Sequence, residues 1–398
     1  MKIFESLNPL LSGTLLVAGT TIGVGMLALP VATGPGGFIP ALAMYLICWL
    51  FMLATGLLLV EVGLSMPKGT SFISMAESVL GPTGKYLFWV AYLFLFVTVM
   101  IAHVAGGGSV LSSIPGWPLP SWVSAMVYTA FFAPVVYLGA KSVDRLNQLL
   151  ITGVVLFYLG FIFVSMGSVQ PELLVYSNWG KAAFALPILV AAFTYQVIIP
   201  TLISYLNRDA RKIRSSIILG SAIPFVIYLI WEFVILGIVP TEGPKGLMAA
   251  ATEGLNAVAP LRHFVQSDWI LTFSNWFAFF ALTTSFIPLA LSFHDFLADG
   301  LKWEKRGLRK LALVFLVFGI PTVIAISKPN VFLTALNYAG GVSCAFLFGL
   351  MPPVMAWICR YNKNCPPETR QLKGGKWTLS LLILFAMVIL AGGIFQQF

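Results

Sequence analysis

The strongest constraint on this chain is a series of eleven apolar runs, each about as long as one helix that crosses a lipid bilayer. A hydrocarbon core of about 30 Å takes about 20 residues of α-helix. Backbone polar groups inside that core must find partners within the protein, which favours continuous helices. The runs cover residues 9–32, 38–64, 86–112, 121–139, 148–168, 183–205, 215–239, 269–297, 309–327, 331–359 and 376–396. The pattern predicts an all-α membrane protein with eleven transmembrane helices.

Composition supports this prediction and excludes several other classes of protein. Hydrophobic residues make up 59% of the 398 residues and charged residues only 9%, whereas a soluble domain is about one quarter charged. The 32 Phe and 11 Trp exclude a disordered chain. Because no segment between the runs is long enough for a soluble domain, we expect one membrane domain over residues 1–398. Helices one to five would cover about 9–168, helices six to ten about 183–359, and helix eleven about 376–396.

Lysine and arginine indicate the orientation, because cytoplasmic loops of membrane proteins carry an excess of both. With the N-terminus in the cytoplasm, 19 of the 23 basic residues lie in cytoplasmic segments, and the opposite side holds only Lys181, Lys245, Arg262 and Lys328. We therefore expect a cytoplasmic N-terminus and a C-terminus on the opposite side. The net charge of +9 is spread over short segments rather than over one face of a soluble module, so it does not indicate nucleic-acid binding.

The four cysteines indicate neither a secreted fold nor a metal centre. Cys48, Cys344, Cys359 and Cys365 lie within the runs or at the expected cytoplasmic face, and their spacing matches no metal site. We expect all four to be unpaired thiols.

The first run is interrupted near its middle by residues that form a poor helix. Gly19, Gly23 and Gly25 bracket Thr20 and Thr21, and each glycine costs about 1 kcal/mol relative to alanine within a helix. Small residues also allow close packing between membrane helices, and Gly19-x-x-x-Gly23 fits that pattern too. The first run by itself leaves both interpretations open.

The sixth run has a matching interruption. Thr194, Tyr195 and Gln196 are polar residues in mid-run, and Pro200 lacks a backbone donor. Runs one and six occupy corresponding places in two sets of five, and paired interruptions of this kind indicate an inverted-repeat transporter whose site lies at the middle of the membrane. The sequence therefore predicts a 5+5 inverted repeat with broken helices one and six, followed by one extra C-terminal helix.

Broken helices supply the chemistry for a zwitterionic substrate. Free N–H groups at the start of one half-helix attract a carboxylate, and free C=O groups at the end of the other attract an ammonium group or a cation. No Lys or Arg lies in the middle of any run, which argues against a strongly anionic substrate such as a phosphate ester.

Few ionisable side chains lie within the runs, and each is costly there unless it is paired or faces water. Glu61 lies near the cytoplasmic end of its run, where we expect its carboxylate to reach water. Glu232 lies deeper and is a candidate for proton coupling or gating. His103 either faces the cavity or is a hydrogen-bonded packing residue. In run eight, Thr284 and Ser285 either bond to carbonyl groups one turn back or line an ion site facing the break in run one.

The sequence GTTIGVGMLALP, at residues 19–30, resembles the opening helix of the bacterial aromatic and hydroxy amino acid permeases, in particular their tyrosine-specific branch. The similarity continues at residues 59–62, 193–205, 218–224, 281–286, 297–299, 336–340 and 373–375, and so covers nearly the whole chain. The chain departs from the family pattern at Tyr195-Gln196, where Phe-His is expected, at His103 in place of an aromatic residue, and at Glu232 in place of Gln.

The resemblance implies the LeuT-like fold of the amino acid–polyamine–organocation superfamily. It also implies import of tyrosine or a related aromatic amino acid across the bacterial inner membrane, driven by protons, with a periplasmic C-terminus. Sodium coupling, and tryptophan or another neutral amino acid, are the alternatives. We expect substrate contacts from Gly19, Thr20, Thr21, Ile22, Gly23, Gly25, Phe193, Thr194, Tyr195, Gln196 and His103. We expect ion coupling by Glu232, Thr284 and Ser285, and no metal or other cofactor.

Two other functional classes fit the sequence less well. A membrane-embedded enzyme acting on lipid phosphates recruits divalent metals through paired carboxylates, but Asp295 and Asp299 stand beside Lys302 and Lys305. An ion channel would show a ring of charge or a repeated filter loop, and neither pattern is evident. We therefore expect a transporter and not an enzyme.

Overall fold

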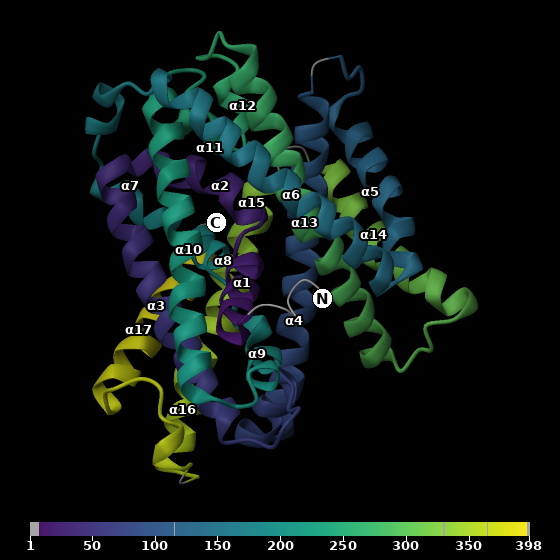
Figure 1. Cartoon of the computed structure of the whole chain (residues 1–398), viewed down its shortest axis with the longest axis vertical. Helices are drawn as coiled ribbons and strands as arrows, with labels where there is room; N and C mark the ends of the chain where they lie inside the picture. The colour runs from purple at the N-terminus through teal and green to yellow at the C-terminus, as the bar shows by residue number, and fades with distance from the viewer. Residues whose placement is uncertain (1–7, 115, 329–330, 364, 396–398) are drawn as a thin grey trace.

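The computed structural model describes residues 8–114, 116–328, 331–363 and 365–395, and within these ranges the regular structure is entirely helical. Ten helices or helix groups are long and apolar enough to cross a membrane, and one bent pair brings the number to eleven. This confirms the expected all-helical membrane protein. Figure 1 shows the helices running largely along the long axis of the molecule.

The eleven spans correspond one to one to the predicted runs. Span one consists of α1 (Pro9–Thr21) and α2 (Val24–Thr33), and span six of α7 (Trp179–Ala182), α8 (Leu186–Ala192) and α9 (Ile199–Tyr205). Spans two to five are α3 (Phe38–Leu64), α4 (Phe72–Ser112), α5 (Ser121–Leu138) and α6 (Ala140–Ser165). Spans seven to nine are α10 (Ala210–Ile238), α13 (Asp268–Leu301) and α14 (Gly307–Ser327). Span ten joins α15 (Val331–Tyr338), η6 (Ala339–Leu350) and α16 (Met351–Tyr361), and span eleven is α17 (Lys376–Phe395); the short helices α11 (Leu247–Thr252) and α12 (Val258–Leu261) lie between spans seven and eight.

Polar side chains mark where several helices begin. Asn8 accepts the N–H of Leu10 at the start of α1, and Ser71 accepts the N–H of Ser74 at the start of α4. Asp209 caps α10, and the backbone N–H of Lys212 is the main cause of the lowered pKa of its carboxyl group. These caps satisfy N–H groups that have no partner within the helix.

Span three begins earlier than the sequence pattern predicts. The pattern places its start at residue 86, but α4 begins at Phe72 and bends at Gly81, whose φ is 79°. The added segment is amphipathic: Phe72, Met75 and Val79 are buried, while Glu77 and Lys85 form an exposed ion pair. Its charged residues lower the mean hydropathy and so hide it from a count of apolar residues.

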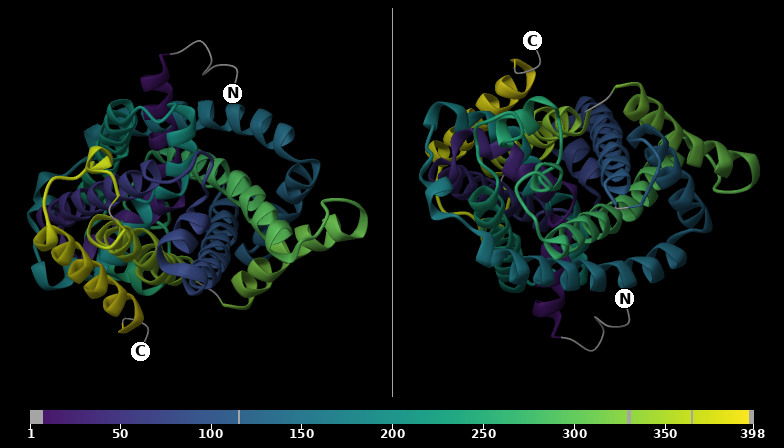
Figure 2. Two further views of the ribbon diagram at one scale, coloured as in Figure 1. Left: turned by 90° about the horizontal axis from the view of Figure 1, so that it is seen from below. Right: turned by 90° about the horizontal axis from the view of Figure 1, so that it is seen from above.

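Spans one to nine pack in two groups, and span ten contacts both of them. One contains α1, α2, α3, α8, α9 and α10, and the other contains α4, α5, α6, α13 and α14. Figure 2 shows the bundle from both ends, with the N- and C-terminal parts on opposite flanks. In Figure 1 the lower end of the bundle carries the loops α3–α4, α9–α10 and α16–α17, and the upper end carries α11 and α12.

Span ten changes from an α-helix to a wider helix where the sequence has two adjacent glycines. Its middle third, η6, is a π-helix that includes Gly340 and Gly341. A Cβ atom on Gly340 would lie 1.8 Å from the carbonyl oxygen of Pro187, and one on Gly341 would lie 2.6 Å from the Cα atom of Gly393. These glycines let span ten approach span six and span eleven closely.

A buried ion pair joins span two to span ten near the lower end. Arg360 Nε lies 2.5 Å from Glu61 Oε1, and its Nη2 lies 2.7 Å from Oε2. The guanidinium also donates to the carbonyl oxygens of Leu372 and Gly374, while Gln371 N–H donates to Glu61. Glu61 is 1% exposed, so the expectation that its carboxylate reaches water was wrong. The bidentate partner lies 299 residues away, beyond any local pattern.

Two of the four cysteines are bonded, contrary to expectation. Cys359 and Cys365 form a disulfide, with their Cα atoms 5.2 Å apart, whereas Cys48 and Cys344 are free and buried. The chain turns back after α16, and the N–H of Cys365 donates to the carbonyl oxygen of Cys359. This turn brings together two cysteines that their spacing alone did not pair.

We predict that Glu61→Gln destabilises the fold by about 3 to 5 kcal/mol, because it leaves the Arg360 charge buried without a full counterion. Thermal unfolding in detergent measures the effect. Glu77→Gln, in the exposed pair with Lys85, is the control and should cost no more than about 1 kcal/mol. The double variant Glu61→Gln/Arg360→Gln should recover part of the loss. An unchanged midpoint for Glu61→Gln would show that the pair contributes nothing.

Candidate functional site

Span one is broken at Ile22 and Gly23, as the glycine pattern predicts. Helices α1 and α2 meet at 57°, and both residues between them have extended backbone. A Cβ atom on Gly23 would lie 3.1 Å from Ser285 Cβ, so glycine leaves room for span eight at the break. The break therefore brings span one against the hydroxyl of Ser285.

The break is narrower than the expected stretch from Gly19 to Gly25. Gly19, Thr20 and Thr21 lie within α1, and the threonine hydroxyls donate to the carbonyl oxygens one turn back, each at 2.8 Å. Gly19 is exposed and has no neighbour within 4 Å of a built Cβ atom. Gly25 is the second residue of α2, and a Cβ atom on it would lie 2.9 Å from Ala192. The start of α2 thus touches the end of α8.

Span six is broken where the sequence predicts it. Helix α8 ends at Ala192, residues 193–195 are not helical, and a short 3-10 turn (Gln196–Ile198) leads into α9. Pro200 occupies the first turn of α9, where its missing N–H costs nothing. The two breaks lie side by side, because Gly25 meets Ala192.

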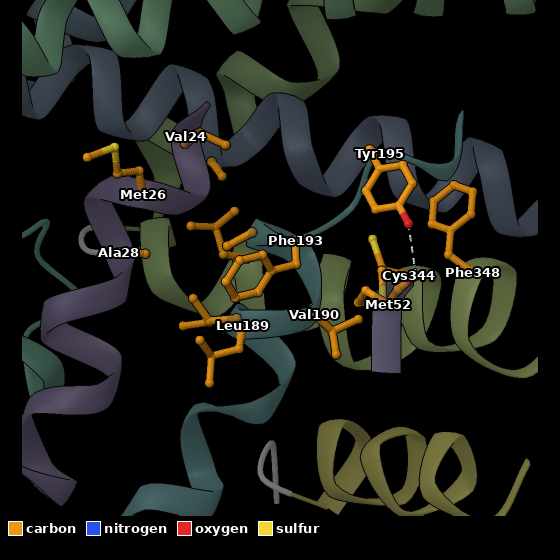
Figure 3. Close-up of a cluster of buried hydrophobic side chains, with 14 of the residues drawn as sticks. Val24, Met26, Ala28, Met52, Leu189, Val190, Phe193, Tyr195, Cys344 and Phe348 are labelled. Atoms are coloured by element: carbon orange, nitrogen blue, oxygen red, sulfur yellow. Dashed lines mark hydrogen bonds between the residues drawn. The ribbon is translucent and has the colours of Figure 1, made fainter. Parts of the chain in front are cut away.

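The residues at the second break point in different directions. Phe193 lies among the rings of Tyr45, Phe225 and Tyr228, with centroids 6.0, 6.2 and 5.4 Å away. Tyr195 turns the other way, and its hydroxyl donates to the carbonyl oxygen of Met52 at 3.2 Å. Figure 3 shows the divergence, with Phe193 beside Leu189 and Tyr195 beside Phe348 and Cys344.

The amide of Gln196 is also committed to span two. Its nitrogen donates to Met52 O at 3.1 Å and lies 3.3 Å from Thr55 Oγ1, while its oxygen accepts the N–H of Tyr195. Thr194 donates to Val190 O at 2.8 Å. Of the four predicted contacts from span six, the structure places the ring of Phe193 beside span seven and fixes Tyr195 and Gln196 against α3.

His103 and Ser285 form a hydrogen-bonded pair beside the first break. Nδ1 of His103 lies 2.8 Å from Val99 O and Nε2 lies 2.9 Å from Ser285 Oγ. A carbonyl oxygen can only accept, so Nδ1 carries a proton. Ser285 Oγ also lies 3.1 Å from the carbonyl oxygens of Ala281 and Leu282, so with a neutral ring its one proton faces three acceptors. Thr284 donates to Ala281 O at 3.1 Å. His103 is therefore hydrogen-bonded, and its partner Ser285 lies against the break in span one.

Glu232 is fully buried in span seven, and its carboxyl group is hydrogen-bonded to two hydroxyl groups. Tyr45 donates to Oε2 at 2.8 Å, and Thr33 makes a short hydrogen bond to Oε1. Thr33 Oγ1 also lies 2.7 Å from Leu29 O, so two acceptors face the one proton of that hydroxyl. A proton on Glu232 resolves the conflict, because the carboxyl group then donates to Thr33 and Thr33 donates to Leu29. All the hydrogen bonds of this cluster can form at once when Glu232 is protonated and therefore uncharged.

Sequence reasoning missed Thr33, Tyr45 and Tyr228. Tyr228 is fully buried, and its hydroxyl lies 2.8 Å from Thr21 O and 3.2 Å from Ala192 O, which are the last carbonyl groups of α1 and α8. Its one available signal is its position one helical turn before Glu232, which places both polar groups on the same face of α10.

Two hollows lie at opposite ends of the broken spans. The one at the lower end has a volume of about 90 Å³ and includes Pro200 and Ile203 of α9. The one at the upper end has a volume of about 450 Å³ and includes Ala32 and Ile188 on spans one and six. Along span six, the break at 193–195 lies between the residues that line the two hollows.

Comparison with known proteins identifies the family. The sequence profile described as the tryptophan/tyrosine permease family matches residues 7–392. The chain is 29% identical to the "Tryptophan-specific transport protein" of Pseudomonas aeruginosa (strain UCBPP-PA14), over 95% of this chain and 92% of that protein. It is also 29% identical to "Tyrosine-specific transport system 2" of Haemophilus influenzae, over 96% and 95% of the two chains, and 27% identical to the "Low affinity tryptophan permease" of Escherichia coli (strain K12), over 95% and 93%. The profile covers nearly the whole chain, and the chain therefore belongs to the tryptophan/tyrosine permease family, a family of transporters rather than enzymes.

Proposed function

We propose that this protein imports an aromatic amino acid, with tyrosine as the first candidate and tryptophan as the second, by proton symport. The observation that carries the proposal is the pair of adjacent breaks in spans one and six, which exposes backbone groups next to Phe193, His103 and Ser285. The two candidate substrates have equal support from relatives, since a tryptophan-specific and a tyrosine-specific protein are each 29% identical to the chain.

An inverted repeat of five and five spans is part of the proposal, and the packing of the helices supports it. Replacing each span by the one five places away exchanges the contact of α1 with α10 for that of α8 with α3, and the contact of α2 with α10 for that of α9 with α3. The same exchange relates α4·α5 to α13·α14, α4·α14 to α13·α5, and α4·α15 to α13·α6. Five is an odd number, so the second repeat enters the membrane from the side opposite to the first.

The proposed orientation places the lower end of Figure 1 in the bacterial cytoplasm, where most basic residues lie. The hollow of about 450 Å³ then faces the periplasm and is large enough for an aromatic amino acid. Because the breaks lie between the two hollows, a substrate bound there can reach one side at a time.

The substrate site that we propose is built mainly from backbone groups. The N–H groups at the start of α2 would bind the carboxylate, and the carbonyl groups at the ends of α1 and α8 would bind the ammonium group. The aromatic side chain would lie against Phe193, while Tyr195 and Gln196 hold the break in place by their bonds to α3.

Proton coupling through Glu232 is favoured by its hydrogen bonds. Every hydrogen-bonding group around Glu232 has a partner when the carboxyl group carries a proton. After loss of that proton, the carboxylate and the carbonyl oxygen of Leu29 would compete for the single hydroxyl proton of Thr33. Gain and loss of this proton would therefore change how α10 bonds to α2 and α3. His103, with Thr284 and Ser285, forms the alternative site for a proton or a sodium ion.

We predict that proteoliposomes holding the protein accumulate labelled tyrosine or tryptophan under an imposed proton gradient and not under a sodium gradient. Competition between the two amino acids measures which is preferred. Accumulation that needs sodium and persists with a protonophore would move the coupling to Thr284 and Ser285. Absence of uptake of either amino acid by inserted protein would overturn the proposed substrate class.

We predict that Gly23→Leu abolishes uptake while the protein still inserts, because a side chain at this position meets Ser285 at the break. Gly392→Leu is the control: this glycine lies within α17 and has no neighbour within 4 Å of a built Cβ atom. Transport rates are compared at equal amounts of inserted protein. Normal transport by the Gly23 variant would remove the break in span one from the site.

We predict that Glu232→Gln abolishes accumulation against a gradient but retains exchange of internal for external substrate. The amide keeps both hydroxyl partners and carries no titratable proton, so binding survives and coupling is lost. Glu172→Gln, in η3 (Pro171–Val175), is the matched control. Accumulation equal to that of the unmodified protein would assign the proton to another residue.

A further inference from the structure

The hydroxyl of Tyr228 is the point at which the two broken spans meet. It is the hydrogen-bond donor to Thr21 O, at the end of α1, and to Ala192 O, at the end of α8. The helix ends at both places, so neither carbonyl oxygen accepts a hydrogen bond from the N–H group four residues later in the chain, as it would within a regular helix. One phenol proton therefore serves two carbonyl oxygens that belong to spans far apart in the sequence.

A count of donors and acceptors shows that this point can take a cation. Each carbonyl oxygen has two lone pairs, whereas the hydroxyl brings one proton, so acceptor capacity remains at both oxygens. Carbonyl groups at the C-terminal end of a helix also carry partial negative charge, which favours a positive group. An ammonium group brings three donors and one charge and fits this arrangement better than a neutral donor does.

The surroundings of Tyr228 fit an aromatic amino acid. Its ring lies 5.4 Å from that of Phe193, so a ligand whose ammonium group binds the two carbonyls has an aromatic wall within reach of its side chain. Glu232 lies one turn further along α10, and its partner Tyr45 also contacts Phe193, at 6.0 Å. The proton site and the carbonyl pair therefore border the same ring.

We propose that Tyr228 is a positioning residue for the ammonium group of the substrate: its hydroxyl holds the carbonyl oxygens of Thr21 and Ala192 on either side of one donor, and the ammonium group binds where these oxygens converge. The inference rests on the proposed function, since it assigns a part of that site. Tyr228 acts through the two carbonyl groups and gives the site its preference for an amino acid over the corresponding acid without an amino group.

The test compares Tyr228→Phe with Tyr158→Phe. Tyr158 is the matched control, because its hydroxyl also donates to a carbonyl oxygen, that of Ile227 on the same helix as Tyr228, but to neither Thr21 O nor Ala192 O. Inhibition of labelled substrate uptake is measured with tyrosine, with tryptophan, and with their deaminated analogues, in which hydrogen replaces the ammonium group. Tyr228→Phe should weaken inhibition by the amino acids about tenfold, the effect of losing hydrogen bonding at a charged group. Inhibition by the deaminated analogues should not change, and Tyr158→Phe should change neither.

The outcomes separate this inference from the proposed function. If the unmodified protein binds neither amino acid, the proposed function fails and the role of Tyr228 fails with it. If the unmodified protein binds them and Tyr228→Phe weakens amino acids and deaminated analogues equally, or neither, Tyr228 has no role in recognising the ammonium group. Should the Phe variant not be recovered as folded protein, Tyr228→Gln, whose amide still donates hydrogen bonds, must restore folding and still discriminate between the two ligand classes less than the unmodified protein does.

Discussion

A backbone N–H or C=O group within a membrane needs a partner inside the protein, and the two broken spans meet this requirement through tertiary contacts. A regular helix satisfies these groups by itself. At Ile22–Gly23 and at residues 193–195 the helix stops, and side chains of other spans take over: Tyr228 donates to Thr21 O and Ala192 O. The breaks therefore depend on span seven, and the position of α10 determines where the free backbone groups point.

Three buried ionisable side chains, Glu61, Glu232 and His103, differ in how their partners offset the free energy of placing a charge within the membrane. Glu61 has a full counterion in Arg360, which suits a fixed structural link between span two and span ten. Glu232 has hydroxyl partners and, among the residues that the structure describes, no cation in its hydrogen bonds, so its charge is balanced most simply by a proton. His103 bonds to a carbonyl group and to the hydroxyl of Ser285, which also lies 3.1 Å from two carbonyl oxygens of its own helix. The difference in partners separates a structural carboxylate from one that can exchange a proton.

Glycine has its largest effect in this protein where spans touch backbone to backbone. Gly25 allows α2 to meet Ala192, Gly340 allows η6 to meet Pro187, and Gly36 lies against Ala182 at the upper end. All three contacts surround the first half of span six. Close packing of this kind holds α8 rigidly while the break after Ala192 leaves its last carbonyl group free for a partner.

Local properties of the sequence determined the number of spans and the places where two of them break. Length and hydropathy act within one run, and glycine, threonine and proline weaken a helix wherever they stand, so eleven spans and both interruptions were predictable. The tertiary structure decided which way each polar group points. Tyr195 and Gln196 face Met52, more than 140 residues away, Arg360 neutralises Glu61 from 299 residues away, and Tyr228 reaches Thr21 across 207 residues. A helix presents every side chain at a regular angle whatever its partner, so a single run contains no record of which neighbour it will meet; only the packing of distant spans settles that.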